Sequence, residues 1–233
     1  MEFDFLAIGA HPDDVELAAG GTVARLVAEG KQVALLDLTR GELGTRGSAE
    51  LRDREAAAAA SMLGVTTRLN AGLPDGALQD NDEQRRVLVR YIRHLRPRIV
   101  LGNAHYDRHP DHGNAAKLIK EACFLAGLRR IETEWEGVPQ GPFRPQKLYH
   151  YVQDHWIHPS FVVDITDYLE AKLQAIRAYG SQFYNPESKE PETYISRPEF
   201  WEHITARARE HGHLVNVRYG EGFVSDTPLL YMF

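Results

Sequence analysis

Apolar and polar positions alternate along the first half of the chain in a pattern that predicts strands and helices in turn. Continuous apolar runs, which are typical of buried parallel strands, cover Phe3–Ala10, Val33–Thr39, Thr66–Leu73 and Arg98–Ala104. Helical spacing follows each run, over Val15–Glu29, Ser48–Gly64 (capped by Ser48), Asp82–Leu95 and Asn114–Leu125. Four β-α units in a row predict a parallel sheet with right-handed crossovers.

The pattern changes after about residue 130, because 17 of the 22 aromatic residues lie at Trp135 or beyond. There we expect strands over Lys147–Trp156, Phe161–Thr166 and Leu229–Phe233, and helices over Tyr168–Tyr179 and Arg197–His211. We interpret residues 1–233 as one α/β domain. Its core (about 1–130) is a Rossmann-like, mostly parallel sheet with helices on both faces, and about 131–233 form a small aromatic-rich cap.

Composition narrows the class of protein. The formal net charge is -6 and no long basic block occurs, so we expect no nucleic-acid partner. No apolar run approaches the roughly 20 residues of a membrane span, and the start of the chain does not resemble a signal peptide. One cysteine, Cys123, cannot form an internal disulfide. We therefore expect a cytoplasmic protein without a membrane partner.

Two loops are dense in side chains that bind metals. Residues 10–14 (AHPDD) follow the first predicted strand, and residues 105–112 (HYDRHPDH) follow the fourth. Functional groups of parallel sheets gather beyond the carboxyl ends of the strands, and strands one and four are often neighbours in such folds. We therefore expect the two loops to meet.

The residue types in the loops suit metal-assisted hydrolysis. A catalytic zinc or ferrous ion takes three imidazole or carboxylate ligands, which His11, one of Asp13 and Asp14, and one of His109 and His112 can supply. The remaining carboxylate can act as general base, and the remaining histidine, held by Asp111, can stabilise an oxyanion. Either loop alone is better explained as a helix start in which Asp is the cap, but two such loops favour a site.

At these residues the sequence resembles the LmbE-like, or PIG-L-like, zinc-dependent N-acetylglucosamine deacetylases. The segment AHPDDVELAAGGT (Ala10–Thr22) and the HPDH of His109–His112 match the two family motifs. Arg52 and Glu55, followed by Leu63-Gly64, resemble its Arg-x-x-Glu…Leu-Gly helix, and YGEGF (Tyr219–Phe223) extends the resemblance along the chain. The segments DLTRGELGTRG, YDRHPDH and YGSQF are most similar to bacterial deacetylases of bacillithiol biosynthesis.

The resemblance assigns roles that spacing leaves open. It implies that His11, Asp14 and His112 bind the metal, that Asp13 is the general base, and that His109 with Asp111 stabilises the oxyanion. It further implies that Arg52 binds an anionic group of the substrate, such as the malate carboxylate. The alternative for Arg52 is a salt bridge with Asp53 or Glu55 on its own helix.

The implied reaction is hydrolysis of the N-acetyl group of N-acetylglucosaminyl-L-malate, with zinc as cofactor and ferrous iron as the alternative. Other N-acetylglucosamine conjugates, including inositol or mycothiol-type conjugates and chitooligosaccharides, remain alternatives, and a homo-oligomer, possibly a hexamer, is implied. Trp156, Tyr184 and Tyr194 are the aromatic candidates for substrate contact.

Three other classes of protein compete with this interpretation. A ferrous oxygenase also uses His-x-Asp…His, but on an all-β fold. A dinucleotide-dependent oxidoreductase needs G-x-G-x-x-G after the first strand, where this chain has two carboxylates that repel a pyrophosphate. A non-catalytic metal- or sugar-binding protein fits the fold but does not need two loops of carboxylates and histidines.

Overall fold

A computed structural model of the chain describes residues 2–230. Its longer elements follow the predicted order: β1 (Phe5–Gly9), α1 (Asp14–Ala28), β2 (Val33–Asp37), α2 (Ala49–Met62), β3 (Thr67–Asn70), α3 (Asp82–Leu95), β4 (Ile99–Gly102) and α4 (Pro110–Ala126). The second half adds β5 (Glu134–Trp135), β6 (Val138–Pro139), β7 (Lys147–Tyr151), β8 (Phe161–Asp164), α5 (Leu169–Arg177), α6 (Pro198–Leu214) and β9 (Gly220–Ser225). Two short 3-10 helices cover Thr166–Tyr168 and Tyr194–Ser196.

One seven-stranded sheet runs through the molecule in the order β3-β2-β1-β4-β7-β9-β8. The first five strands are parallel, and β9 pairs antiparallel with both β7 and β8. The predicted α/β sheet is confirmed, and β1 and β4 are neighbours as expected. The C-terminal residues add to the core by continuing its sheet through β7, β9 and β8.

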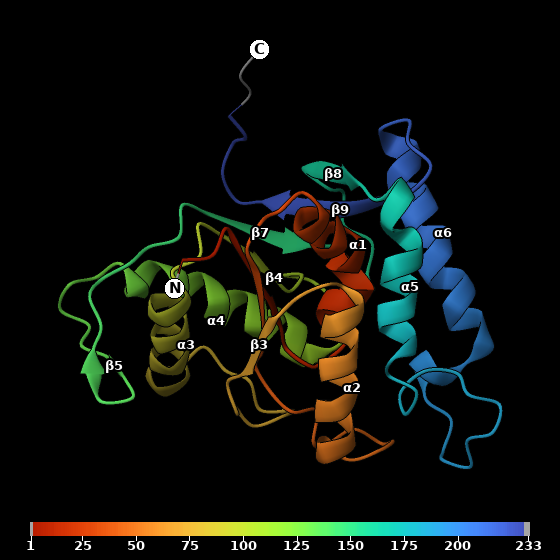
Figure 1. Cartoon of the computed structure of the whole chain (residues 1–233), viewed down its shortest axis with the longest axis horizontal. Coiled ribbons are helices and arrows are strands. Elements are labelled where there is room, and N and C mark those ends of the chain that lie inside the picture. Colours follow the sequence, from red (N-terminus) through yellow and green to blue (C-terminus); the bar gives the residue numbers. More distant parts are fainter. Residues whose placement is uncertain (1, 231–233) are drawn as a thin grey trace.

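Alternate residues of each strand face two separate cores. In β1, Ala7 faces the core built with α1, α2, α5 and α6, whereas Leu6 and Ile8 face the core built with α3 and α4. Figure 1 shows the same division, with α3 and α4 on one side of the molecule and α2, α5 and α6 on the other. The predicted helices on both faces are therefore present. Across residues 2–230, none of the helices is both long enough and apolar enough to cross a bilayer.

The bounds of several elements differ from the sequence prediction, and two of the differences have a clear physical cause. Helix α4 begins at Pro110, four residues before the predicted Asn114, because proline fits the first helical position and His109 is the N-cap. The last strand is β9, not the predicted Leu229–Phe233; Leu229 and Leu230 form no strand, and residues 231–233 lie outside the described residues.

The glycines of β9 made this strand difficult to predict from the sequence, and close packing explains why they are there. Glycine weakens a strand, so the segment YGEGF does not look like one. A Cβ atom at Gly222 would lie 2.9 Å from Nε2 of His211, and one at Gly220 would overlap a methyl of Val162. The strand therefore needs glycine where α6 and β8 press against it.

Candidate active site

The first loop leaves β1 and enters α1 through a strained residue. Asp13 has a φ of 118°, in the left-handed region that side-chain-bearing residues rarely adopt. Its side chain makes no capping hydrogen bond, so a structural role as the helix cap does not explain this carboxylate. Backbone strain of this kind costs about 1–3 kcal/mol and is typical of functional sites, where it fixes the direction of a side chain.

The second loop meets the first because β1 and β4 are adjacent. The imidazole rings of His11 and His112 lie 5.5 Å apart, measured between their centres. The Asp14 carboxylate joins them: its two oxygens lie 3.6 Å from Nδ1 of His11 and 3.1 Å from Nε2 of His112. His109 completes the group, since ring nitrogens of His11, His109 and His112 all lie within 4.8 Å of one another. Three imidazoles and a carboxylate form a donor set that can hold a transition-metal ion.

A carboxylate stands behind each of the two imidazoles that face Asp14. Nδ1 of His112 lies 2.6 Å from an oxygen of Asp107. Nε2 of His11 lies 3.1 Å from Asp75 and 3.3 Å from Asp111. Histidines that bind metals usually have such a partner on the second ring nitrogen, which fixes the tautomer and leaves the first nitrogen for the ion. The side chains therefore fit a metal at His11, Asp14 and His112.

Asp14 is held in one orientation by neutral donors. One carboxylate oxygen accepts hydrogen bonds from the His11 backbone N–H and from the side-chain amide of Asn103, both at 3.0 Å. The other oxygen accepts from the Gln153 amide at 2.7 Å. Burial alone would raise the pKa of Asp14, but the neighbouring His112 and His11 hold it well below its ordinary value. Asp14 is therefore a carboxylate anion, the form that binds a cation.

Asp13 has the opposite electrostatic environment. Burial raises the pKa of its carboxyl group to about 7, and the negative charge of Asp14 acts in the same direction. The guanidinium of Arg52 opposes this effect, with Nη1 3.5 Å from the Asp13 carboxylate and 3.1 Å from the Pro12 carbonyl oxygen. A carboxyl group that titrates near neutral pH is suited to exchange a proton with water.

Arg52 is buried and directed into the site, away from Asp53 and Glu55 on its own helix. Asp53 pairs with Arg40, and Glu55 accepts two hydrogen bonds from Ser181, at 2.7 Å each. The Nε atom of Arg52 is buried and has no hydrogen-bond partner among the described residues. Glycine is required opposite it, because a Cβ atom at Gly41 would lie 3.0 Å from Nη1. The guanidinium therefore has hydrogen-bonding capacity that its protein neighbours do not use.

His109 and Asp111 are linked through the backbone. Nδ1 of His109 accepts the Asp111 N–H at 3.2 Å, which leaves its Nε2 as the nitrogen that carries a proton. The Asp111 carboxylate itself accepts hydrogen bonds from the N–H groups of Gly76 and Leu78, at 2.8 and 3.3 Å, and contacts His11. Asp111 therefore orients His109 with its main chain and His11 with its side chain.

All seven residues singled out from the sequence converge on one cleft or its wall. The cleft has a volume of about 420 Å³, in the range of small-molecule sites, and is lined by Asp13, Asp14, Arg52, His109 and His112, among others. Arg108 and Ile195 also reach it. Of the three aromatic candidates, Trp156, Tyr184 and Tyr194, none lines this cleft, although all three are partly exposed.

Sequence reasoning gave no role to Asp75, Asn103, Asp107 and Gln153, which support the site. Asp75 follows β3, Asn103 and Asp107 follow β4, and Gln153 follows β7, so each lies beyond the carboxyl end of a parallel strand. The rule that led to the two loops could have found them, since these strand ends share one edge of the sheet. Gln153 was hidden because the predicted strand ran on to Trp156.

Comparison with known protein families shows to which family the chain belongs. The family model described as PIG-L, GlcNAc-PI de-N-acetylase, matches residues 6–123, about half of the chain. Diacetylchitobiose deacetylase of Thermococcus kodakarensis is 33% identical over an alignment that covers 93% of this chain and 80% of the relative. The chain therefore belongs to the PIG-L family of deacetylases, and the resemblance of its two loops to that family is confirmed.

Other relatives are named for sugar conjugates with inositol or malate. A deacetylase of 1D-myo-inositol 2-acetamido-2-deoxy-alpha-D-glucopyranoside from Saccharopolyspora erythraea is 32% identical, covering 76% of this chain and 77% of the relative. A probable N-acetyl-alpha-D-glucosaminyl L-malate deacetylase of Bacillus anthracis is 24% identical, with coverages of 84% and 93%. The relatives thus share deacetylation of an amino sugar and differ in what that sugar is attached to.

Two solved structures share the fold over most of this chain. A conserved protein from Thermus thermophilus superposes with a TM-score of 0.88 at 42% identity, covering 99% of this chain and 97% of that one. The N,N'-diacetylchitobiose deacetylase of Pyrococcus horikoshii, solved with an inhibitor, has a TM-score of 0.80 at 29% identity, with coverages of 94% and 82%. These matches confirm the α/β fold of the family.

Proposed function

We propose that this protein hydrolyses the N-acetyl group of an N-acetylglucosamine conjugate, with Asp13 as general base. The observation that carries the proposal is the juxtaposition of two carboxylates with different charge states. Asp14 is held as an anion between His11 and His112, whereas the neighbouring Asp13 titrates near neutral pH. In such a pair, the ionised carboxylate can bind the metal while the other carboxyl group transfers the proton.

His11, Asp14 and His112 would hold the metal, and Asp111, Asp75 and Asp107 would orient the two imidazoles. Zinc suits this donor set, and ferrous iron is the alternative. A divalent ion in this position supplies a Lewis acid that polarises the acetamide carbonyl. The proposed ligands agree with the family membership, and the identity of the metal is part of the proposal.

The protein's own groups move the protons. Asp13 accepts a proton from the attacking water while the water oxygen bonds to the carbonyl carbon. Nε2–H of His109 donates a hydrogen bond to the oxygen that becomes negative. Asp13 then gives the proton to the amide nitrogen as the C–N bond breaks. The products are acetic acid and a free amine, which ionise to acetate and an ammonium group on the sugar, so atoms and charge balance.

The substrate we propose is N-acetylglucosaminyl-L-malate, as in bacillithiol biosynthesis. The positive charge of the Arg52 guanidinium, which lines the cleft, supports a carboxylate-bearing substrate. A second candidate is diacetylchitobiose, favoured by the relative that is 33% identical. Inositol conjugates are a third. We also propose that the protein acts in the cytoplasm as a homo-oligomer. Light scattering on the purified protein tests its oligomeric state.

The test is release of acetate and free amine from N-acetylglucosaminyl-L-malate, diacetylchitobiose and free N-acetylglucosamine, measured side by side. Each is assayed with the protein as purified, after chelation, and after zinc or ferrous iron is restored. We expect metal-dependent turnover that strongly prefers the malate conjugate, and loss of that preference in Arg52→Gln. Preference for diacetylchitobiose would keep the deacetylase and overturn the malate assignment. No turnover of any conjugate by metal-loaded protein would overturn the function itself.

A further inference from the structure

A second, partly enclosed cavity of about 50 Å³ lies beside the cleft, between α1, α6 and β9. It shares a wall with the cleft, formed by Leu17, Arg108, His112, Gln153 and Ile195. His112 is one of the metal ligands proposed above, so the cavity starts where the reaction would occur. A single water needs only about 10–15 Å³ of such space, and the cavity can therefore hold a molecule of several heavy atoms.

One part of the cavity lining is apolar. Its side chains come from the inner faces of α1 and α6 and from the segment after β7: Leu17, Ala18, Val152, Phe200, Ile204 and Ala208. Ala18 and Ala208 are almost completely buried, and their small side chains leave the space open. Apolar walls favour a methyl or methylene group over bulk water. This part of the lining therefore suits a hydrocarbon group.

The other part of the lining is charged, with more positive than negative groups. Arg108, Lys172 and Arg207 carry positive charge, and Asp154 and Glu221 carry negative charge. The lining holds three histidines. His112 is a proposed metal ligand, and burial lowers the pKa of the other two, His203 and His211, that of His211 to about 4, so both are neutral. The three cations and two carboxylates leave the lining with one more positive than negative charge.

Both carboxylates of the lining are already engaged. Glu221 pairs with Lys172 at 2.6 Å and accepts the N–H groups of Gly21 and Thr22, at 3.0 and 2.7 Å. Asp154 accepts a hydrogen bond from the Tyr194 hydroxyl at 3.2 Å and lies 3.6 Å from Arg108. These partners therefore reduce the electrostatic repulsion between the two carboxylates and an incoming anion.

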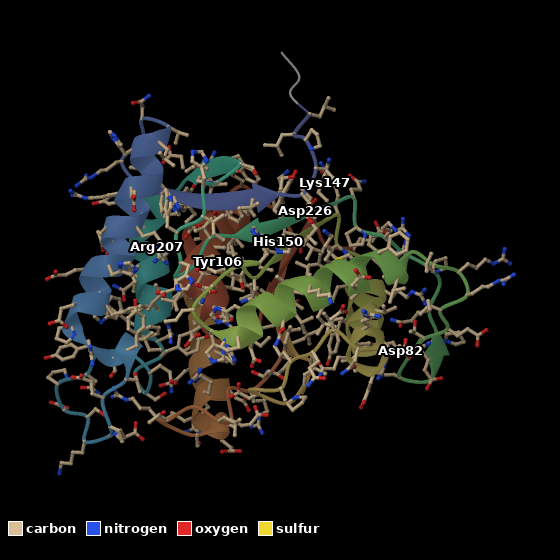
Figure 2. The ribbon with its side chains drawn as sticks, turned by 180° about the vertical axis from the view of Figure 1, so that it is seen from behind. Asp82, Tyr106, Lys147, His150, Arg207 and Asp226 are labelled. Carbon is tan, nitrogen blue, oxygen red and sulfur yellow. The ribbon has the colours of Figure 1, made fainter. Side chains whose placement is uncertain are left out.

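Arg207 is the cation best placed to meet a ligand. Its guanidinium donates to the Asp154 carbonyl oxygen and contacts His203, and it lies 4.0 Å from the Asp154 carboxylate, too far for a hydrogen bond. In Figure 2 Arg207 lies on α6 beside the loop that carries Tyr106, which is the loop between β4 and α4. That loop leads to His112, so the guanidinium faces the side of the cavity next to the cleft.

We propose that this cavity binds a short-chain carboxylate and receives the acetate released at the cleft. The methyl group of acetate matches the apolar wall, and its carboxylate matches the excess positive charge of the lining. The cavity gives acetate a place to go while the larger amino sugar still covers the cleft. The binding site stands on the cavity itself, whereas its role in product release rests on the proposed deacetylase function.

Direct binding of ¹³C-methyl-labelled acetate to the zinc-loaded protein, followed by NMR titration, tests the site. The decisive variant is Ala208→Leu, which fills the cavity, and its matched control is Ala206→Leu, the same change on the exposed side of α6. We expect Ala208→Leu to weaken acetate binding by about tenfold or more and the control to bind as the unaltered protein does. Equal binding by all three proteins would place acetate elsewhere and overturn the proposal, as would no binding at all.

A second pair of variants keeps the test decisive if Ala208→Leu does not fold. Arg207→Gln removes the cation without filling the space, and Arg209→Gln makes the same change on an exposed residue of the same helix. We expect weaker acetate binding only in Arg207→Gln, and in the unaltered protein weaker binding of acetamide, the neutral isostere, than of acetate. Acetamide bound as tightly as acetate would contradict recognition of the carboxylate.

Turnover distinguishes failure of the cavity from failure of the function. If the protein deacetylates its substrate while Ala208→Leu shows unchanged inhibition by added acetate, the release role is wrong and the deacetylase stands. If no conjugate is deacetylated but acetate still binds and is lost in Ala208→Leu, the carboxylate site stands and the function falls.

Discussion

Two clusters of buried charge lie side by side along α1, and they are paired very differently. In the first, every charge faces an opposite one: Arg68 binds Asp37 through two nitrogens, at 2.7 and 2.8 Å, and Glu16 at 2.5 Å. The ion pair between Lys172 and Glu221 is equally close. In the second cluster, at the cleft, Arg52 at 3.5 Å and His11 oppose the effects of burial and of the Asp14 charge on Asp13, but they do not cancel them.

The difference separates charges that hold the fold from charges that do chemistry. A buried ion without a partner costs several kcal/mol, so structural charges are matched closely. Where a carboxyl group must gain and lose a proton, incomplete pairing is the useful condition, because it brings the pKa near the working pH. Glu16 and Asp14 lie on the same helix only two residues apart, yet they belong to different clusters.

The sharpest way to test the comparison is Asp13→Asn. We expect kcat for deacetylation of the substrate to fall by about 10²–10⁴-fold, because the amide side chain of the variant cannot accept the proton. Metal content, measured by atomic spectrometry, and thermal unfolding should remain as they are, since Asp13 neither caps α1 nor belongs to the proposed ligands. Turnover near that of the unaltered protein would show that Asp13 is not the base.

Breaking the paired cluster should instead cost stability. Lys172→Met leaves Glu221 buried without its cation, and we expect the free energy of unfolding to drop by about 3–5 kcal/mol in denaturant titrations. The double variant with Glu221→Gln should recover much of this loss. Lys120→Met is the matched control at an exposed pair with Asp226, where the loss should not exceed about 1 kcal/mol. Similar losses at both sites would contradict the distinction.

Buried His211 makes the stability of the paired region depend on pH. Its pKa falls from 6.5 in the unfolded chain to about 4 in the fold, because burial disfavours the charged ring. As pH falls from 6.5 to 4, His211 takes up a proton in the unfolded state but not in the folded state. The free energy of unfolding therefore decreases by about 3 kcal/mol. His211→Phe should remove this part of the pH dependence, measured by unfolding at a series of pH values, while His213→Phe on the exposed side should retain it.

The smallest expected effect concerns the support of a metal ligand. An oxygen of Asp107 lies 2.6 Å from Nδ1 of His112, and Asp107→Asn removes the charge of this partner. We expect the affinity for zinc to fall by about 10–100-fold. Competition with a chromophoric chelator measures this directly. Asp80→Asn, which alters a carboxylate that pairs with Arg85 and does not line the cleft, should leave the affinity as it is. Unchanged affinity in Asp107→Asn would mean that His112 needs no such support.

Several long-range contacts explain motifs that the sequence could only match by resemblance. The two glycines before Thr22 lie where α1 meets the C-terminal half: a Cβ atom at Gly21 would lie 2.8 Å from Ile165, and the Gly21 N–H donates to Glu221. Glu55 binds Ser181. Segments almost 200 residues apart are therefore structural partners, and their shared motifs hold the cleft in shape.

The sequence by itself determined the elements and the chemical inventory of the site. Periodicity, caps and glycines act within a few residues, so α3 (Asp82–Leu95) could be predicted to the residue, and Asn81 caps it as such signals require. The order of β-α units predicted that the loops after β1 and β4 meet, and the resemblance of the two motifs to the family led to the proposal that His11, Asp14 and His112 bind the metal.

Only the tertiary structure decided how those residues differ from one another. Asp13 and Asp14 are adjacent and identical in chemistry, yet one is strained and weakly compensated and the other is held by Asn103 and Gln153. Burial and neighbouring charge set that difference, and both depend on which strands lie together. The glycine-rich β9 was missed for the same reason, since its pairing with β7 and β8 stabilises a strand that local preference disfavours.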